Sequence, residues 1–107
     1  MITFFFRLET SKTLKDGTHP IYLCFKSNEG IKTKWYRHYT GRSAHKKQWI
    51  GKGNKKRVSA AAPGAGVTNS RLEYLYTGAD AIITNAKNLK HDLTIEYLKN
   101  RFENEVL

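Results

Sequence analysis

Residues 15–41 read KDGTHPIYLCFKSNEGIKTKWYRHYTG, and this stretch predicts a two-stranded antiparallel ribbon. One strand covers Ile21–Phe25, where the side chains alternate between two faces. Residues 28–30, Asn-Glu-Gly, tolerate positive φ in a hairpin loop, and the returning strand covers Ile31–Tyr39 before Thr40 and Gly41 end the ribbon. The returning strand mixes aromatic residues with Lys and Arg, so the ribbon is the feature that the function must explain.

Alternation assigns a face to each residue of the first strand of this ribbon. One face carries Ile21, Leu23 and Phe25, and the other carries Tyr22, Cys24 and Lys26. In the returning strand the two sets are Trp35, Arg37 and Tyr39, and Lys34, Tyr36 and His38. The residue pattern leaves open which of the last two sets is buried, because a β-bulge would exchange them.

A further strand precedes the ribbon. Ile2–Leu8 is rich in β-branched and aromatic residues, and a polar loop at residues 12–18 separates it from the ribbon. Pro20 can stand at the head of the next strand because a first position need not donate to the ladder. The side chains expected toward the core are Ile2, Phe4, Phe6 and Leu8.

Residues 42–66 form a basic, glycine-punctuated loop. Trp49 is its one large apolar anchor, and we expect it to cover a sheet edge or the end of the core. Residues 59–66 combine four alanines, Pro63 and two glycines, which indicates a disordered loop.

Apolar residues then recur with helical spacing over residues 68–90, with Thr68 or Asn69 as the expected N-cap. The periodic set is Leu72, Leu75, Tyr76, Ala79, Ile82, Ile83, Ala86 and Leu89. A second helix runs from Ile95 to about Glu105, capped by Thr94, and its apolar stripe packs either on the sheet or on something outside the chain. The expected fold class is α+β, a three-stranded antiparallel sheet packed on a C-terminal helix with a second short helix at the end.

The 107 residues are enough for one domain, and their net charge of +10 suits a polyanionic partner or an anionic membrane surface. Residues 1–60 hold fourteen Lys or Arg side chains against three acidic ones, so the charge belongs to the ribbon half. Cys24 is the only cysteine, which excludes an internal disulfide and indicates a reducing compartment. The apolar start of the chain is too short for a signal sequence or a membrane span.

Basic and aromatic side chains on a sheet fit nucleic acid for two separate reasons. Lys and Arg neutralise phosphates, and side chains on a ribbon can reach base edges in the major groove. The plainer alternatives are a solvated basic face, a mobile solvated loop at residues 52–57, and Phe4, Phe6, Tyr36 and Trp49 acting as core. No histidine pair has metal-ligand spacing and no nucleophile has a recognisable base, so we expect no enzyme, metal or cofactor.

Five motifs occur in order: Phe4–Arg7, Lys15–Leu23, Tyr39–Gly41, Trp49 and Leu93–Glu96. Together they resemble the N-terminal arm-type DNA-binding domain of bacterial tyrosine recombinases, the integrases of phages and conjugative transposons. The resemblance implies a three-stranded sheet that lies in the major groove of arm-site DNA. It also implies that core-binding and catalytic domains follow in the full-length chain, since this chain contains no His-x-x-Arg motif.

Carried over by position, the resemblance places Tyr36 and His38 inward, and Cys24 stands where members of the family commonly carry Arg. The residues expected to contact DNA are Arg7, Tyr22, Lys26, Lys34, Trp35, Arg37, Arg42, Lys55 and Lys56. The resemblance places five of them on the DNA-facing side, namely Arg7, Tyr22, Lys26, Trp35 and Arg37. Lys34 belongs to the ribbon, and the last three come from the basic loop.

We therefore predict a sequence-preferring module for double-stranded DNA at residues 1–90, with the sheet at 2–41, the basic loop at 42–66 and the helix at 68–90. Residues 91–107 are expected to form a linker helix toward the other recombinase domains, which act in DNA integration and recombination. The expected location is the cytoplasm, with no membrane contact. The alternatives are a β-sheet module for RNA or single strands and a basic domain that docks an acidic protein.

Overall fold

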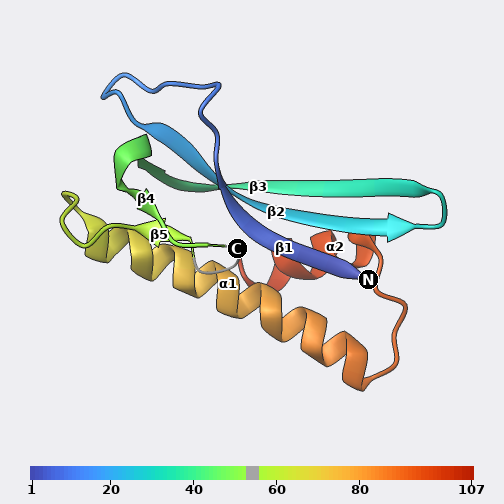
Figure 1. Cartoon of the computed structure of the whole chain (residues 1–107). Coiled ribbons are helices and arrows are strands. Elements are labelled where there is room, and N and C mark those ends of the chain that lie inside the picture. Colours follow the sequence, from blue (N-terminus) through green and yellow to red (C-terminus); the bar gives the residue numbers. More distant parts are fainter. Residues whose placement is uncertain (53–55) are drawn as a thin grey trace.

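The computed structural model describes residues 1–52 and 56–107 of the chain. Its main sheet has three antiparallel strands, β1 (Ile2–Leu8), β2 (His19–Glu29) and β3 (Lys32–Ala44), in the order β1-β2-β3. Two helices, α1 (Ala65–Asn88) and α2 (Ile95–Glu105), follow the sheet in the sequence (Figure 1). The prediction of an α+β fold with this sheet and these two helices is confirmed.

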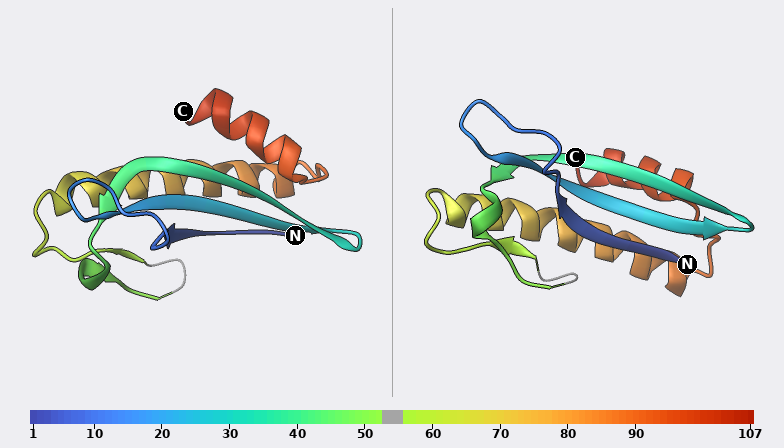
Figure 2. Two further views of the ribbon diagram at one scale, coloured as in Figure 1. Left: turned by 90° about the horizontal axis from the view of Figure 1, so that it is seen from above. Right: turned by 45° about the horizontal axis from the view of Figure 1, so that its top comes forward.

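Both helices lie on one side of the sheet. In Figures 1 and 2, α1 runs along one face, α2 lies on the β3 side, and the opposite face carries no helix. The predicted core positions of β2 are fully buried, since Ile21, Leu23 and Phe25 each expose 0% of their surface. In β1 the buried side chains are Ile2, Phe6 and Leu8, with Phe4 packed against the same core. The predicted alternation of β1 and β2 is confirmed.

The β2–β3 hairpin closes with a two-residue turn. Glu29 pairs with Lys32, so Gly30 and Ile31 form the loop, and Gly30 has a φ of +66° that favours glycine. The prediction that Thr40 and Gly41 end the ribbon is wrong, because β3 continues to Ala44. The register shifts between Pro20 and Tyr22, where an irregularity with Gly41 at φ +80° bends the strand without ending it.

Helix α1 begins earlier than its sequence pattern indicates. Gly64 occupies the N-cap position in the left-handed region without a side-chain cap, so the prediction of Thr68 or Asn69 as N-cap is wrong. The segment before the helix is also ordered, in contrast to the expected disordered loop. The amide of Ala62 donates to Ser59 O at 2.9 Å, and Ala62 is buried. The helix ends at Asn88, which leaves Leu89 exposed and outside the periodic face.

Helix α2 is capped as predicted, because Thr94 Oγ1 accepts a hydrogen bond from the amide of Tyr97 at 3.1 Å. Its stripe faces the sheet, with Leu98 and Phe102 both fully buried. The end of α2 also contacts α1, where Tyr74 donates from its hydroxyl to Val106 O at 2.8 Å. The open question of where this stripe packs is therefore answered: α2 belongs to the core of the domain.

Part of the basic loop has structure that the sequence analysis missed. Residues Lys46–Gln48 form a 3-10 turn, and β4 (Trp49–Ile50) pairs with β5 (Arg57–Val58) on the β1 side of the main sheet (Figure 2). Trp49 packs against the core, as expected for an anchor. Asn69 of α1 holds β5, since its amide group donates to and accepts from the Val58 backbone, both at 2.9 Å.

Candidate nucleic-acid interface

The sheet surface opposite α1, called here the outer face, is built from three rows that each cross all three strands. The rows are Arg7, Tyr22 and Tyr39; Phe5, Cys24 and Arg37; and Thr3, Lys26 and Trp35. Antiparallel pairing brings the side chains of each row next to one another on the same face. The ambiguity in β3 is resolved in the same way, because Tyr36 and His38 point inward, where both rings contact Phe102 of α2.

Trp35 organises one end of the outer face. Lys26 Nζ lies 5.5 Å and Arg37 Cζ 5.3 Å from the centre of its ring, and Phe5 meets it edge-on at 6.3 Å. Cations over an aromatic face are attracted by the ring quadrupole. Trp35 nevertheless exposes 44% of its surface. This end of the face therefore presents two oriented cations and an open indole to a ligand.

The other end of the outer face includes a loop residue that the sequence analysis missed. Lys12 Nζ lies 3.4 Å from the Tyr22 hydroxyl and 5.5 Å from the centre of its ring. Tyr22 in turn packs on Tyr39 at 5.6 Å. Strand alternation gives no face to a residue in the 9–18 loop, so the sequence held no signal that would place Lys12 here.

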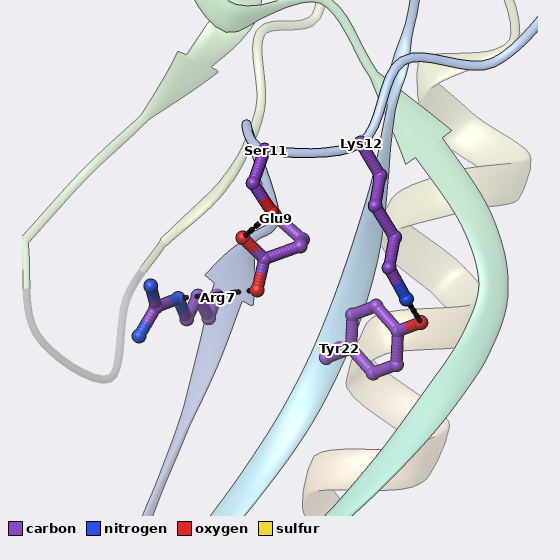
Figure 3. Close-up of polar contacts among 5 residues, drawn as sticks. All are labelled: Arg7, Glu9, Ser11, Lys12 and Tyr22. Carbon is purple, nitrogen blue, oxygen red and sulfur yellow. Dashed lines mark hydrogen bonds and ion pairs between the residues drawn. The ribbon is translucent and has the colours of Figure 1, made fainter.

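Arg7 and Glu9 form an ion pair at this end, with 3.7 Å between Arg7 Nε and Glu9 Oε2 (Figure 3). Ser11 donates from Oγ to Glu9 Oε1 at 2.8 Å. The Ser11 hydroxyl, helped by the charges of Arg7 and Lys12, lowers the pKa of Glu9 below its ordinary value. Glu9 is thus an ionised acceptor at neutral pH. Exposed ion pairs contribute little to fold stability, so the pair matters for how it orients Arg7.

Cys24 occupies the centre of the outer face but exposes only 1% of its surface. Burial raises the pKa of its thiol, although the charges of Arg37 and Arg7 partly oppose this. The thiol is therefore in its neutral form, and it lies beneath the cationic side chains of the outer face. A side chain so covered is not itself placed to contact a phosphate.

Two of the predicted contact residues, Lys34 and Arg42, lie away from the outer face. Lys34 alternates with Trp35 and so projects on the side of Tyr36 and His38, with its Nζ 3.8 Å from Glu29 Oε2. Arg42 is half-buried and donates from Nε and Nη2 to Thr68 Oγ1, at 3.0 and 2.9 Å, which ties β3 to α1. Lys56 is half-buried and lines a hollow beside β1 together with Phe5 and Arg7 of the outer face. Lys55 lies outside the described residues.

Within residues 1–52 and 56–107, no group of three His, Cys, Asp or Glu side chains could hold a metal ion. Among the helices of the described parts of the chain, none has the length and apolar character needed to cross a membrane.

The fold and the outer face together define a small α+β module that presents cations and aromatic rings on an open sheet. The family model described as the Arm DNA-binding domain, which is found in phage integrases, matches residues 6–99, and the chain belongs to this family. The searches of curated proteins and of solved structures find no match. The chain is therefore a DNA-binding module of integrase-type proteins, and this module is non-catalytic.

Proposed function

We propose that the outer face of the sheet enters the major groove of double-stranded DNA and binds arm-type sites with a preference for their sequence. The observation that carries this proposal is the arrangement of the three rows on a face that no helix covers. Three of the nine side chains in these rows are Arg or Lys, and they are Arg7, Lys26 and Arg37.

The dimensions of DNA favour this geometry. A β-ribbon fits a major groove about 12 Å wide, where Arg can donate to guanine and apolar groups can meet the thymine methyl. Arg37 and Lys26 are held beside Trp35 and would project into such a groove. The exposed Lys46 and Lys47 follow the end of β3 and would contact the backbone phosphates. Base and phosphate contacts thus come from neighbouring parts of one surface.

In the full-length protein the module would position a tyrosine recombinase, the enzyme of a mobile element, at its arm sites during DNA integration and recombination. Residues 91–107 would lead toward the core-binding and catalytic domains. Since α2 packs on the sheet, the direction in which the chain leaves the module is set by the fold of the module itself. Its partner would be double-stranded DNA at arm-type sites, which corresponds to a cytoplasmic location.

A competition assay tests the proposal. The whole chain is bound to a labelled random duplex, and unlabelled duplex, single-stranded RNA and an acidic protein compete for it. We expect duplex to compete best, with affinity that falls steeply as salt rises. Stronger competition by single-stranded RNA would overturn the proposal, because the 44% exposed rings of Trp35 and Tyr39 would then be stacking on unpaired bases. Selection of bound fragments from a random duplex library then identifies the preferred sequence.

A further inference from the structure

A hollow of about 100 Å³ opens on the outer face where the 9–18 loop meets the sheet. Its lining combines three cations, one carboxylate, a phenol and a thiol, from Arg7, Lys12, Arg37, Glu9, Tyr22 and Cys24. A site made only to hold a phosphate would gain nothing from a carboxylate, because the two negative charges repel each other. The presence of Glu9 in this basic hollow therefore needs an explanation of its own.

Glu9 is held in place from two directions. Its backbone amide donates to Pro20 O at 2.9 Å, which fixes the chain directly after β1. Its carboxylate receives the Ser11 hydroxyl at 2.8 Å and lies 3.7 Å from Arg7 Nε. Arg7 and Glu9 are two residues apart on extended chain, so both side chains project from the same side of the sheet. Figure 3 shows the carboxylate of Glu9 between Ser11 and Arg7.

Arg7 keeps donors available while Glu9 orients it. The ion pair uses Nε, and the side chain of Arg7 is 55% exposed. A carboxylate accepts hydrogen bonds only, and a guanidinium only donates them. The pair thus presents donors directly beside an acceptor, on the surface proposed to meet DNA.

We propose that Arg7 and Glu9 together read one G·C base pair, a proposal that rests on the major-groove function above. The major-groove edge of this pair presents two acceptors, guanine N7 and O6, followed by the amino donor on cytosine N4. Arg7 donates to the guanine, and Glu9 accepts from the cytosine. An A·T pair presents a different order of groups, so Glu9 is a specificity-determining residue as well as a positioning residue for Arg7.

The test uses the whole chain and the duplex obtained by selection. In the wild-type chain, replacing the critical guanine with 7-deazaguanine removes N7 and lowers affinity about tenfold, as does exchanging the pair for A·T. Arg7→Lys keeps the positive charge but loses the two parallel donors of the guanidinium. The affinity ratio between the two duplexes should therefore fall, while the dependence of affinity on salt concentration stays unchanged. Glu9→Ala also lowers discrimination between the two duplexes, because the acceptor for the cytosine amino group is lost.

Glu73→Ala is the matched control, because it removes the same charge from an exposed position on α1. Glu73→Ala should leave the ratio of the affinities for the two duplexes unchanged. If Glu9→Ala raises affinity for both duplexes equally, or if the selected site holds no G·C pair that depends on Arg7, the proposal is overturned. A chain that shows no preference for duplex at all would instead refute the major-groove function, so the two failures are distinguishable.

Discussion

Phe102 of α2 packs edge-on against Phe25 of β2, with 5.4 Å between the ring centres, although the two residues are 77 positions apart in the sequence. Both rings are fully buried. Phe102→Ala would leave a cavity at the centre of the core, so we expect it to lower the free energy of unfolding by about 3–5 kcal/mol in urea denaturation. Asn100→Ala, on the exposed side of the same helix, should change it little. Equal small effects of both substitutions would mean that α2 does not dock on the sheet in solution.

Gly78 of α1 faces the end of α2 so closely that a Cβ atom there would lie 2.7 Å from Val106 Cγ2. Gly78→Ala should therefore destabilise the domain, despite the better helix propensity of alanine. When Val106→Ala removes the clash, the same Gly78→Ala change should become stabilising by up to about 1 kcal/mol. A double-mutant cycle measured by thermal or urea unfolding checks this reversal of sign. Additive effects of the two changes would contradict the close packing.

His38 lies between β3 and α2, with its ring 5.6 Å from that of Phe102. Burial, and secondarily the charge of Arg71, lowers the pKa of His38 below its ordinary 6.5, while Glu103 opposes this. The unfolded chain therefore binds a proton more readily than the folded one, and stability must fall as the pH drops below about 6.5. Urea unfolding between pH 7.5 and pH 5 should show this loss.

Substitution separates His38 from the other titrating groups. His38→Gln should reduce the loss of stability between pH 7.5 and pH 5. An identical profile for wild type and His38→Gln would show that His38 does not carry the acid sensitivity.

The faces of β1 and β2 could be predicted because strand alternation is a local property of the sequence. The face of β3 could not be decided from its own residues, since Trp35 and Tyr36 are both large aromatic side chains. What decides it is Phe102, which contacts Tyr36 at 6.3 Å from a distant part of the chain. The resemblance to the arm-type DNA-binding domains predicted the correct inward face of β3, whereas the residue pattern alone left two possibilities.

The predictions that failed depended on tertiary partners. Thr68 has the chemistry of an N-cap, but its hydroxyl accepts from Arg42 of β3, and the helix begins earlier at Ala65. Asn69 similarly pairs with the backbone of Val58. At the candidate site, Lys12 and Glu9 belong to a loop whose path no periodic pattern describes. The positions of such loop residues become known only from the packing of the loop on the sheet in the folded structure.

Arg37 and Lys34 offer a direct test of the outer face, because each carries one positive charge on β3 and they project from opposite sides of the sheet. If Arg37 contacts a base, Arg37→Ala should weaken binding to the selected duplex by about 1–3 kcal/mol and relax its sequence preference. Lys34→Ala should weaken binding to selected and random duplexes to the same small extent.

Titrations of both duplexes at several salt concentrations separate these two effects, since a lost phosphate contact also lowers the salt slope by about one unit. If Lys34→Ala costs as much specific affinity as Arg37→Ala, DNA is not bound by the outer face alone. The hairpin tip, where Lys34 lies beside Glu29, would then have to enter the interface as well.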